Sequence, residues 1–92
     1  MELTFVMVAD LPPVGVPAFQ KYESRVLPLL ARHGGRLERR LRTQDALTEV
    51  HIVAFESQQG YESYLADEER QAHSGLLDGV DIVQRLLQVH DV

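Results

Sequence analysis

The segment Thr48-Glu49-Val50-His51-Ile52-Val53-Ala54-Phe55-Glu56 determines how the rest of this 92-residue chain is interpreted. Its apolar side chains fall on both alternating faces: Val50, Ile52 and Ala54 on one, Val53 and Phe55 on the other. A strand that is apolar on both faces is typical of the centre of a sheet that is covered on both sides. Ser57 follows at once and is a favourable helix N-cap. The segment therefore predicts a central strand that leads into a helix.

A second segment of the same character lies near the start of the chain. Residues 3–9 are apolar apart from Thr4 and are rich in side chains that favour strands, so they predict another central strand. The residues that follow include Pro12, Pro13 and Gly15, which indicate a loop.

The first helix is predicted to begin near Pro17 and to end at Gly34-Gly35. Apolar residues recur along it at helical spacing and form one stripe: Phe19, Tyr22, Val26, Leu29 and Leu30. Polar residues fill the opposite side: Gln20, Lys21, Glu23, Ser24 and Arg25. Pro28 lies inside this helix and predicts a kink, because proline has no N–H to donate to the preceding turn.

Three further elements complete the chain. Residues 36–42 alternate leucine with charged side chains, which predicts a half-exposed edge strand joined by a short loop to the central strand. A helix is predicted from about Gln58, with a break near Asp67, which would act as the N-cap of a second helical piece. Residues 80–90 predict the last strand.

The predicted order of elements is β-α-β-β-α-β, which defines an α+β, ferredoxin-like fold in a single domain spanning residues 1–92. Right-handed crossovers place the first and third strands in the centre of a four-stranded antiparallel sheet. The expected strand order is 4-1-3-2, with both helices on one face. The same two strands are predicted to be central from their composition alone.

Composition excludes several classes of function. The net charge of −5 disfavours nucleic acid as a partner, and the absence of cysteine excludes disulfides and Cys-ligated metals. The N-terminal residues lack the features of a signal peptide, and no apolar run approaches the ~20 residues of a transmembrane helix. We therefore expect a cytoplasmic protein that has no membrane partner.

The candidate site comes from the pairing of the strand at residues 36–42 with the central strand. The preferred register sets Arg42 opposite Glu49 and Arg40 opposite His51, because it separates apolar from polar faces and pairs opposite charges. It also sets Leu37 opposite Ala54 and Glu38 opposite Val53. Glu38, Arg40 and His51 are then predicted on the sheet face away from the helices, beside Val53 and Phe55.

This cluster allows two interpretations. A histidine beside an arginine and a glutamate could move a proton or orient an anionic or enolic ligand, which makes His51 the candidate catalytic residue and Glu38, Arg40 and His51 the candidate ligand-binding set. The alternative is a dimer interface with buried hydrogen bonds. The four histidines show no metal-ligand spacing, and no motif for a nucleotide or other cofactor is present, so neither a metal nor a cofactor is predicted.

Three stretches carry a resemblance to a known superfamily: residues 22–37 with Val26-Leu27-Pro28-Leu29-Leu30 and His33-Gly34-Gly35, residues 49–57, and Tyr64-Leu65-Ala66-Asp67-Glu68-Glu69-Arg70. Together they resemble the dimeric α/β-barrel superfamily, and especially its small uncharacterised members related to the antibiotic-biosynthesis monooxygenases. The resemblance covers about residues 3–90 in spacing and element order. It implies a homodimer through the open sheet face, and in some members a small organic ligand or haem bound inside.

Two functions follow as alternatives. The first is a small homodimeric protein that binds or transforms a small organic molecule in a pocket on the sheet, by monooxygenase-like or isomerase-like chemistry. The second is a non-catalytic dimeric interaction or structural module, favoured by the absence of a recognised catalytic motif.

Overall fold

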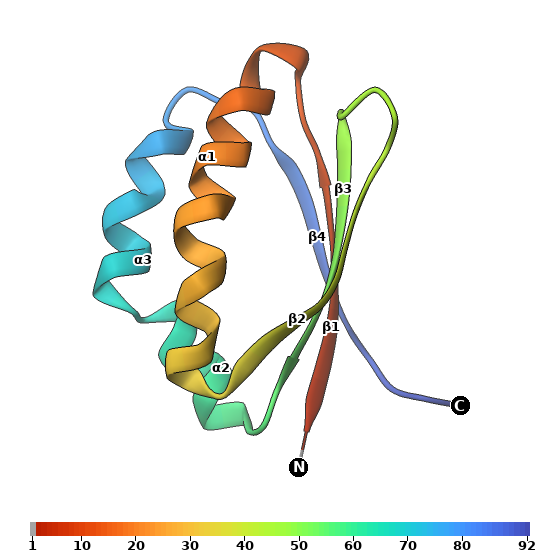
Figure 1. The fold of residues 1–92 in the computed structure, drawn as a ribbon, viewed down its shortest axis with the longest axis vertical. Helices are drawn as coiled ribbons and strands as arrows, with labels where there is room; N and C mark the ends of the chain where they lie inside the picture. Colours follow the sequence, from red (N-terminus) through yellow and green to blue (C-terminus); the bar gives the residue numbers. More distant parts are fainter. Residues whose placement is uncertain (1) are drawn as a thin grey trace.

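The computed structural model describes residues 2–92. Its four strands are β1 (Leu3–Asp10), β2 (Gly35–Arg42), β3 (Thr48–Phe55) and β4 (Val83–Val89). The α-helices are α1 (Val16–Val26), α2 (Gln58–Leu65) and α3 (Glu68–Ala72), and the 3₁₀ segments are η1 (Pro13–Gly15), η2 (Leu27–His33) and η3 (His73–Leu77). The strands form one antiparallel sheet in the order β2-β3-β1-β4, which is the predicted order 4-1-3-2 counted from the other edge. The helices lie together on one side of the sheet (Figure 1), so the predicted ferredoxin-like α+β fold is confirmed.

The proline and the glycine pair shape the first helical segment as the sequence indicates. The α-helix ends at Val26, and the chain continues as the 3₁₀ segment η2, which has Pro28 in its first turn. The predicted kink therefore takes the form of a change from α- to 3₁₀-helix. Gly34 closes the segment at φ 67°, a left-handed conformation that favours glycine, and its N–H donates to the Leu30 carbonyl oxygen.

Two side-chain caps start the second helical segment. Ser57 Oγ accepts a hydrogen bond from the Gly60 N–H at 3.0 Å, which begins α2. Asp67 Oδ1 accepts hydrogen bonds from the N–H groups of Glu69 and Arg70 at 2.9 and 3.2 Å, which begins α3 as predicted. The other oxygen of Asp67 lies 2.7 Å from His33 Nε2, so the end of η2 is tied to the start of α3.

Alternate residues of each strand face opposite sides of the sheet. On β1, the side chains of Leu3, Phe5, Met7 and Ala9 are buried beneath the helices. The antiparallel register pairs Met7 with His51, Phe5 with Val53 and Leu3 with Phe55. His51, Val53 and Phe55 therefore face the helices, because directly opposed residues share one face of a sheet. Val50, Ile52 and Ala54 point to the open face.

This arrangement reverses the predicted orientation of β3, in which His51, Val53 and Phe55 faced away from the helices. The prediction assigned the uniformly apolar set to the helix side because the other set contained an imidazole. In the structure the large apolar side chains occupy the helix side, with Phe55 only 2% exposed, and the polar groups beside them bond to one another. Burying a polar group costs little free energy when its hydrogen bonds are made. The polar side chains therefore do not prevent this face of β3 from packing against the helices.

The register of the β2–β3 hairpin agrees with the prediction near the turn and departs from it farther along. Arg42 pairs with Glu49, Leu41 with Val50 and Arg40 with His51, as expected. An irregularity between Leu37 and Arg39 then shifts the strand by one residue. Leu37 consequently pairs with Val53 on the helix side, where the predicted partner was Ala54, and Glu38 leaves the ladder.

None of the helices within residues 2–92 combines the length and the apolar character needed to cross a membrane.

Candidate functional site

A cavity of about 320 Å³ lies between the sheet and the helices. Its walls come from β1, β3 and β4 on one side and from α1, η2, α2 and α3 on the other. Four aromatic side chains line it: Phe5, Phe55, Tyr61 and Tyr64. Four polar side chains also reach it: Glu23, His51, Arg70 and Gln84. A mainly apolar cavity with a few convergent polar groups is the usual form of a small-molecule site.

The aromatic rings form one side of the cavity. Phe5 and Tyr61 stack with their centroids 4.4 Å apart and their planes 24° apart. Phe55 meets Phe5 and Tyr61 edge to face, with centroid separations of 6.3 and 5.5 Å. These packed rings hold one another in place and provide a rigid apolar surface on which a flat organic molecule could rest.

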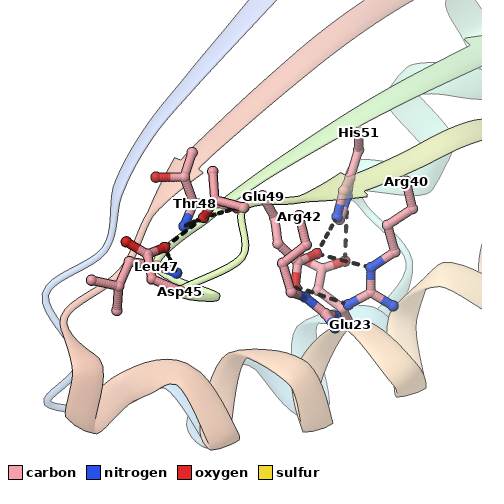
Figure 2. A network of polar contacts seen from close by, with 9 residues as sticks. Glu23, Arg40, Arg42, Asp45, Leu47, Thr48, Glu49 and His51 are labelled. Carbon is pink, nitrogen blue, oxygen red and sulfur yellow. Dashed lines mark hydrogen bonds and ion pairs between the residues drawn. The ribbon is translucent and has the colours of Figure 1, made fainter.

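A buried carboxylate, Glu49, holds the polar groups next to His51, which lines the cavity. The Glu49 side chain is fully buried, and four hydrogen bonds reach it from three side chains (Figure 2). Arg40 donates from Nε to Oε1 at 2.8 Å and from Nη2 to Oε2 at 3.3 Å, and Arg42 donates from Nε to Oε2 at 2.9 Å. His51 Nε2 lies 2.8 Å from Oε1. The two arginines come from β2 at positions that alternation places on the helix side.

These contacts keep Glu49 ionised. Burial acts to raise the pKa of Glu49, but the hydrogen bonds from Arg40, His51 and Arg42 outweigh it and hold the pKa at about 2. An ionised carboxylate can only accept hydrogen bonds, so His51 carries its proton on Nε2 and donates it to Glu49. Burial lowers the pKa of His51, although Glu49 opposes that shift, so the ring is neutral and Nδ1 is available as a proton acceptor.

Glu23 approaches His51 from α1. Its carboxylate Oε2 lies 4.0 Å from His51 Nδ1, and the residue is only 5% exposed. Burial raises the pKa of Glu23 to about 7, with Arg40 opposing the shift and Glu49 adding to it. Within residues 2–92 no hydrogen bond holds the carboxylate in one protonation state. Glu23 can therefore both accept and donate a proton near neutral pH.

Glu23 was predicted on the polar side of the first helix, opposite the apolar stripe, and this prediction is wrong. Glu23 lies four residues after Phe19 and three before Val26, both of which are almost fully buried. That spacing is the available signal, since residues three and four apart share a helix face. The charge of Glu23 led to its assignment to solvent.

Arg70 closes the cavity from α3. The carbon at the centre of its guanidinium lies 4.7 Å from the centroid of the Tyr64 ring. Its Nε is buried and has no hydrogen-bond partner within residues 2–92. Burial raises the pKa of Tyr64, and Arg70 opposes that shift, so the phenol stays protonated near neutral pH. The sequence patterns assigned no functional role to Arg70.

The predicted site residues are only partly brought together. Arg40 and His51 meet at Glu49 on the helix side of the sheet, opposite to the predicted side. Glu38 is exposed at the irregularity of β2 and makes no hydrogen bond to the cluster. Within residues 2–92, no group of three or more His, Asp or Glu side chains is arranged to hold a metal ion.

The chain shares its fold with solved structures described as antibiotic biosynthesis monooxygenases and a cofactor-independent oxygenase, which agrees with the fold expected from the resemblance. No protein-family model matches the sequence, and no curated protein shows significant sequence similarity to it. The similarity to solved structures is therefore one of fold.

Three solved structures illustrate that similarity. A candidate antibiotic biosynthesis monooxygenase from Nitrosomonas europaea matches with a TM-score of 0.80 at 12% identity, over 99% of this chain and 90% of that one. SnoaB, a cofactor-independent oxygenase from Streptomyces nogalater, matches with a TM-score of 0.69 at 22% identity, over 99% and 95%. A NIPSNAP family protein of unknown function from Agrobacterium tumefaciens matches with a TM-score of 0.67 at 15% identity, over 95% and 87%.

Proposed function

We propose that this protein binds a small, mainly apolar organic molecule in the cavity and moves a proton on it, with Glu23 and His51 as the groups that exchange the proton. The observation that carries the proposal is the Glu23 carboxylate, buried at an apolar cavity beside a neutral imidazole. A carboxylate desolvated in this way is a stronger base than one in water, and its raised pKa suits proton transfer near neutral pH.

The reaction class that fits is proton abstraction from a carbon next to a carbonyl group. Glu23, in its ionised form, takes the proton, and the electron pair of the broken C–H bond moves into the carbonyl to give an enolate. Return of the proton from Glu23 to the same carbon after exchange with solvent replaces the hydrogen. Where a C=C bond is conjugated with the enolate, return of the proton to the far end of the conjugated system moves the double bond and completes an isomerisation. Glu49 acts as a positioning residue, because it fixes the His51 tautomer.

Deuterium exchange into 2-tetralone tests this function, since the ketone is aromatic, compact and has acidic C–H bonds next to its carbonyl. The wild-type protein in deuterium oxide is expected to accelerate loss of the corresponding proton NMR signals. Glu23→Gln should reduce the acceleration on the order of a hundredfold, as expected for loss of a general base, and His51→Gln should also reduce it. Lys21→Gln, on the exposed side of α1, is the control and should retain the rate. Equal rates in wild type and Glu23→Gln would contradict the proposal.

Oxygenation is a second candidate, supported by the match in fold to a cofactor-independent oxygenase. A fold by itself does not imply a function, so this candidate is weaker than proton transfer. Consumption of dissolved oxygen during the same incubation distinguishes the two. A dimer that neither exchanges deuterium nor consumes oxygen would favour the non-catalytic interaction module.

We also propose that the protein is a homodimer through the open face of the sheet. The helices cover only the other side (Figure 1), and the open face carries mainly branched apolar side chains. They are Val6, Val8, Leu41, Val50, Ile52, Val83, Leu87 and Val89. A contiguous apolar surface of this kind is typical of an interface, and a second copy of the chain offers a matching one.

Ile52→Asp tests the dimer, because Ile52 lies on β3 near the middle of this face. The variant is expected to be monomeric or insoluble in light scattering at micromolar concentration, since an unpaired charge is costly to bury in an apolar interface. Lys21→Asp, on the outer side of α1, introduces the same side chain elsewhere and should leave the dimer intact. A wild-type protein that is monomeric under these conditions would contradict the proposal.

A further inference from the structure

We infer that the cavity selects an organic monoanion, a mainly apolar molecule whose single anionic group lies against Arg70, and that its binding is accompanied by proton uptake on Glu23. This inference rests on the proposed small-molecule function and deepens it by naming the chemical class of the ligand.

The first observation is the unsatisfied donor on Arg70. Its Nε is buried without a hydrogen-bond partner within residues 2–92, while the guanidinium lies over the Tyr64 ring at the cavity wall. Arg70 is placed there by the Asp67 cap, which accepts from its backbone N–H. A buried donor that is left unpaired is costly, and a charged donor more so. A ligand oxygen in the cavity would remove that cost, and an anionic oxygen would remove it best.

The second observation is the sign of the charge around the cavity. Glu23 and Arg70 line the cavity, and the ion pairs that Arg40 and Arg42 form with Glu49 are joined to it through His51. The arginines outnumber the carboxylates even when Glu23 is ionised, although the whole chain carries a net charge of −5. Since His51 is neutral, these residues together carry a net positive charge whether or not Glu23 is ionised, which favours an anion over a neutral ligand.

Glu23 couples this binding to protons. The charged and titratable groups that face it come from every neighbouring element: Arg40 on β2, Glu49 and His51 on β3, Tyr64 on α2, Arg70 on α3 and Tyr22 beside it on α1. An anion at Arg70 adds negative charge near Glu23 and reduces the stabilisation that Arg70 gives to the carboxylate. The pKa of Glu23 should therefore rise further on binding, and the protein should take up a proton near neutral pH.

The same charge distribution links the inference to the proposed reaction. Proton abstraction from a neutral ketone gives an enolate oxyanion and a protonated Glu23, and a bound carboxylate beside protonated Glu23 presents the same charges. The cavity would thus be complementary to the charge that develops during the reaction, as differential binding requires. An aromatic carboxylate is accordingly a mimic of the reacting state.

The test compares 2-naphthoate with the neutral 2-naphthamide by isothermal titration calorimetry on the full chain. At about pH 6 the carboxylate is expected to bind about tenfold more tightly or better, and this preference should shrink at about pH 8. At about pH 8, where free Glu23 is ionised, two buffers of different ionisation enthalpy should report uptake of a proton on binding. Arg70→Gln should abolish the preference for the carboxylate with little effect on the amide. Arg25→Gln, an exposed arginine of α1, is the matched control and should keep it.

The ratio of the two affinities is the decisive quantity, because a general loss of structure would weaken both ligands equally. Equal affinities in the wild type, no carboxylate binding at millimolar concentration, or equal weakening of both ligands by Arg70→Gln would overturn the inference. The experiment involves no turnover. Carboxylate selectivity without deuterium exchange would therefore contradict the proposed reaction alone, and exchange without selectivity would contradict this inference alone.

Discussion

Replacement of Glu49 by glutamine is expected to lower the free energy of unfolding by about 3–5 kcal/mol, the usual result of removing one partner from a buried ion pair. The Glu49 side chain is fully buried and accepts hydrogen bonds from Arg40, Arg42 and His51. A glutamine amide has no charge and offers fewer acceptor positions, so it leaves two arginines without a counter-ion. Arg42 is 40% exposed at its side chain and contributes the smaller part of the loss.

Urea denaturation at neutral pH measures this effect, with Glu38→Gln on the exposed part of β2 as the control. The pH dependence gives a second check. The folded pKa of Glu49, about 2, lies below the ordinary value of 4.5, so its contribution is fully present above about pH 4.5 and is lost as the pH falls towards 2. The difference between wild type and Glu49→Gln should shrink over that acid range. A loss of less than about 1 kcal/mol at neutral pH would show that water replaces these contacts.

Glu23→Gln is expected to act in the opposite direction and to stabilise the protein at alkaline pH. The folded pKa of Glu23, about 7, lies above the ordinary value of 4.5, so the folded state retains a proton that the unfolded state has lost between these two values. The free energy of unfolding of the wild type therefore falls as the pH rises from about 4.5 through 7. The cost of ionising Glu23 in the folded state amounts to about 3 kcal/mol, and glutamine avoids it.

Denaturation of wild type and Glu23→Gln at about pH 5 and about pH 8 checks this expectation. The two proteins should be similarly stable at the lower pH, and the variant should be more stable at the higher pH. Glu62→Gln on the exposed side of α2 is the control and should show no such divergence. A gain in stability at the expense of deuterium exchange would be typical of a strained functional residue. A difference that is the same at both pH values would contradict the burial of an ionisable Glu23.

The sequence alone determined the elements and their order, because these depend on local signals. The two doubly apolar strands, the caps at Ser57 and Asp67 and the left-handed Gly34 each act through neighbouring residues. The strand order then follows from the handedness of the crossovers, which allows few alternatives. Even the hairpin register near the turn was predictable, since charge pairing at Arg42 and Glu49 favours one choice.

The tertiary structure alone decided which side of the sheet faces the helices. Periodicity identifies a buried face only when the other face is polar, and β3 is apolar on both. The polar side chain of His51 made its face of β3 look less suitable for the core. The sequence of one strand does not reveal that His51 will bond to Glu49, which in turn accepts hydrogen bonds from Arg40 and Arg42. Such bonds form between side chains that share no local pattern, so their benefit becomes visible only once the strands are paired.

The candidate site could not be predicted from the sequence for the same reason. Glu23 reaches the cavity because α1 packs where Phe19 and Glu23 meet His51 of β3. Arg70 reaches it because the contact between His33 and Asp67 holds α3 against the end of η2. The sequence does not mark either residue as buried, because most glutamates and arginines in folded proteins are exposed to solvent. Their burial is a property of how the helices pack on the sheet, and with it come the raised pKa of Glu23 and the unpaired donor of Arg70. Local sequence thus specified the scaffold, whereas long-range packing brought the residues of the candidate site together.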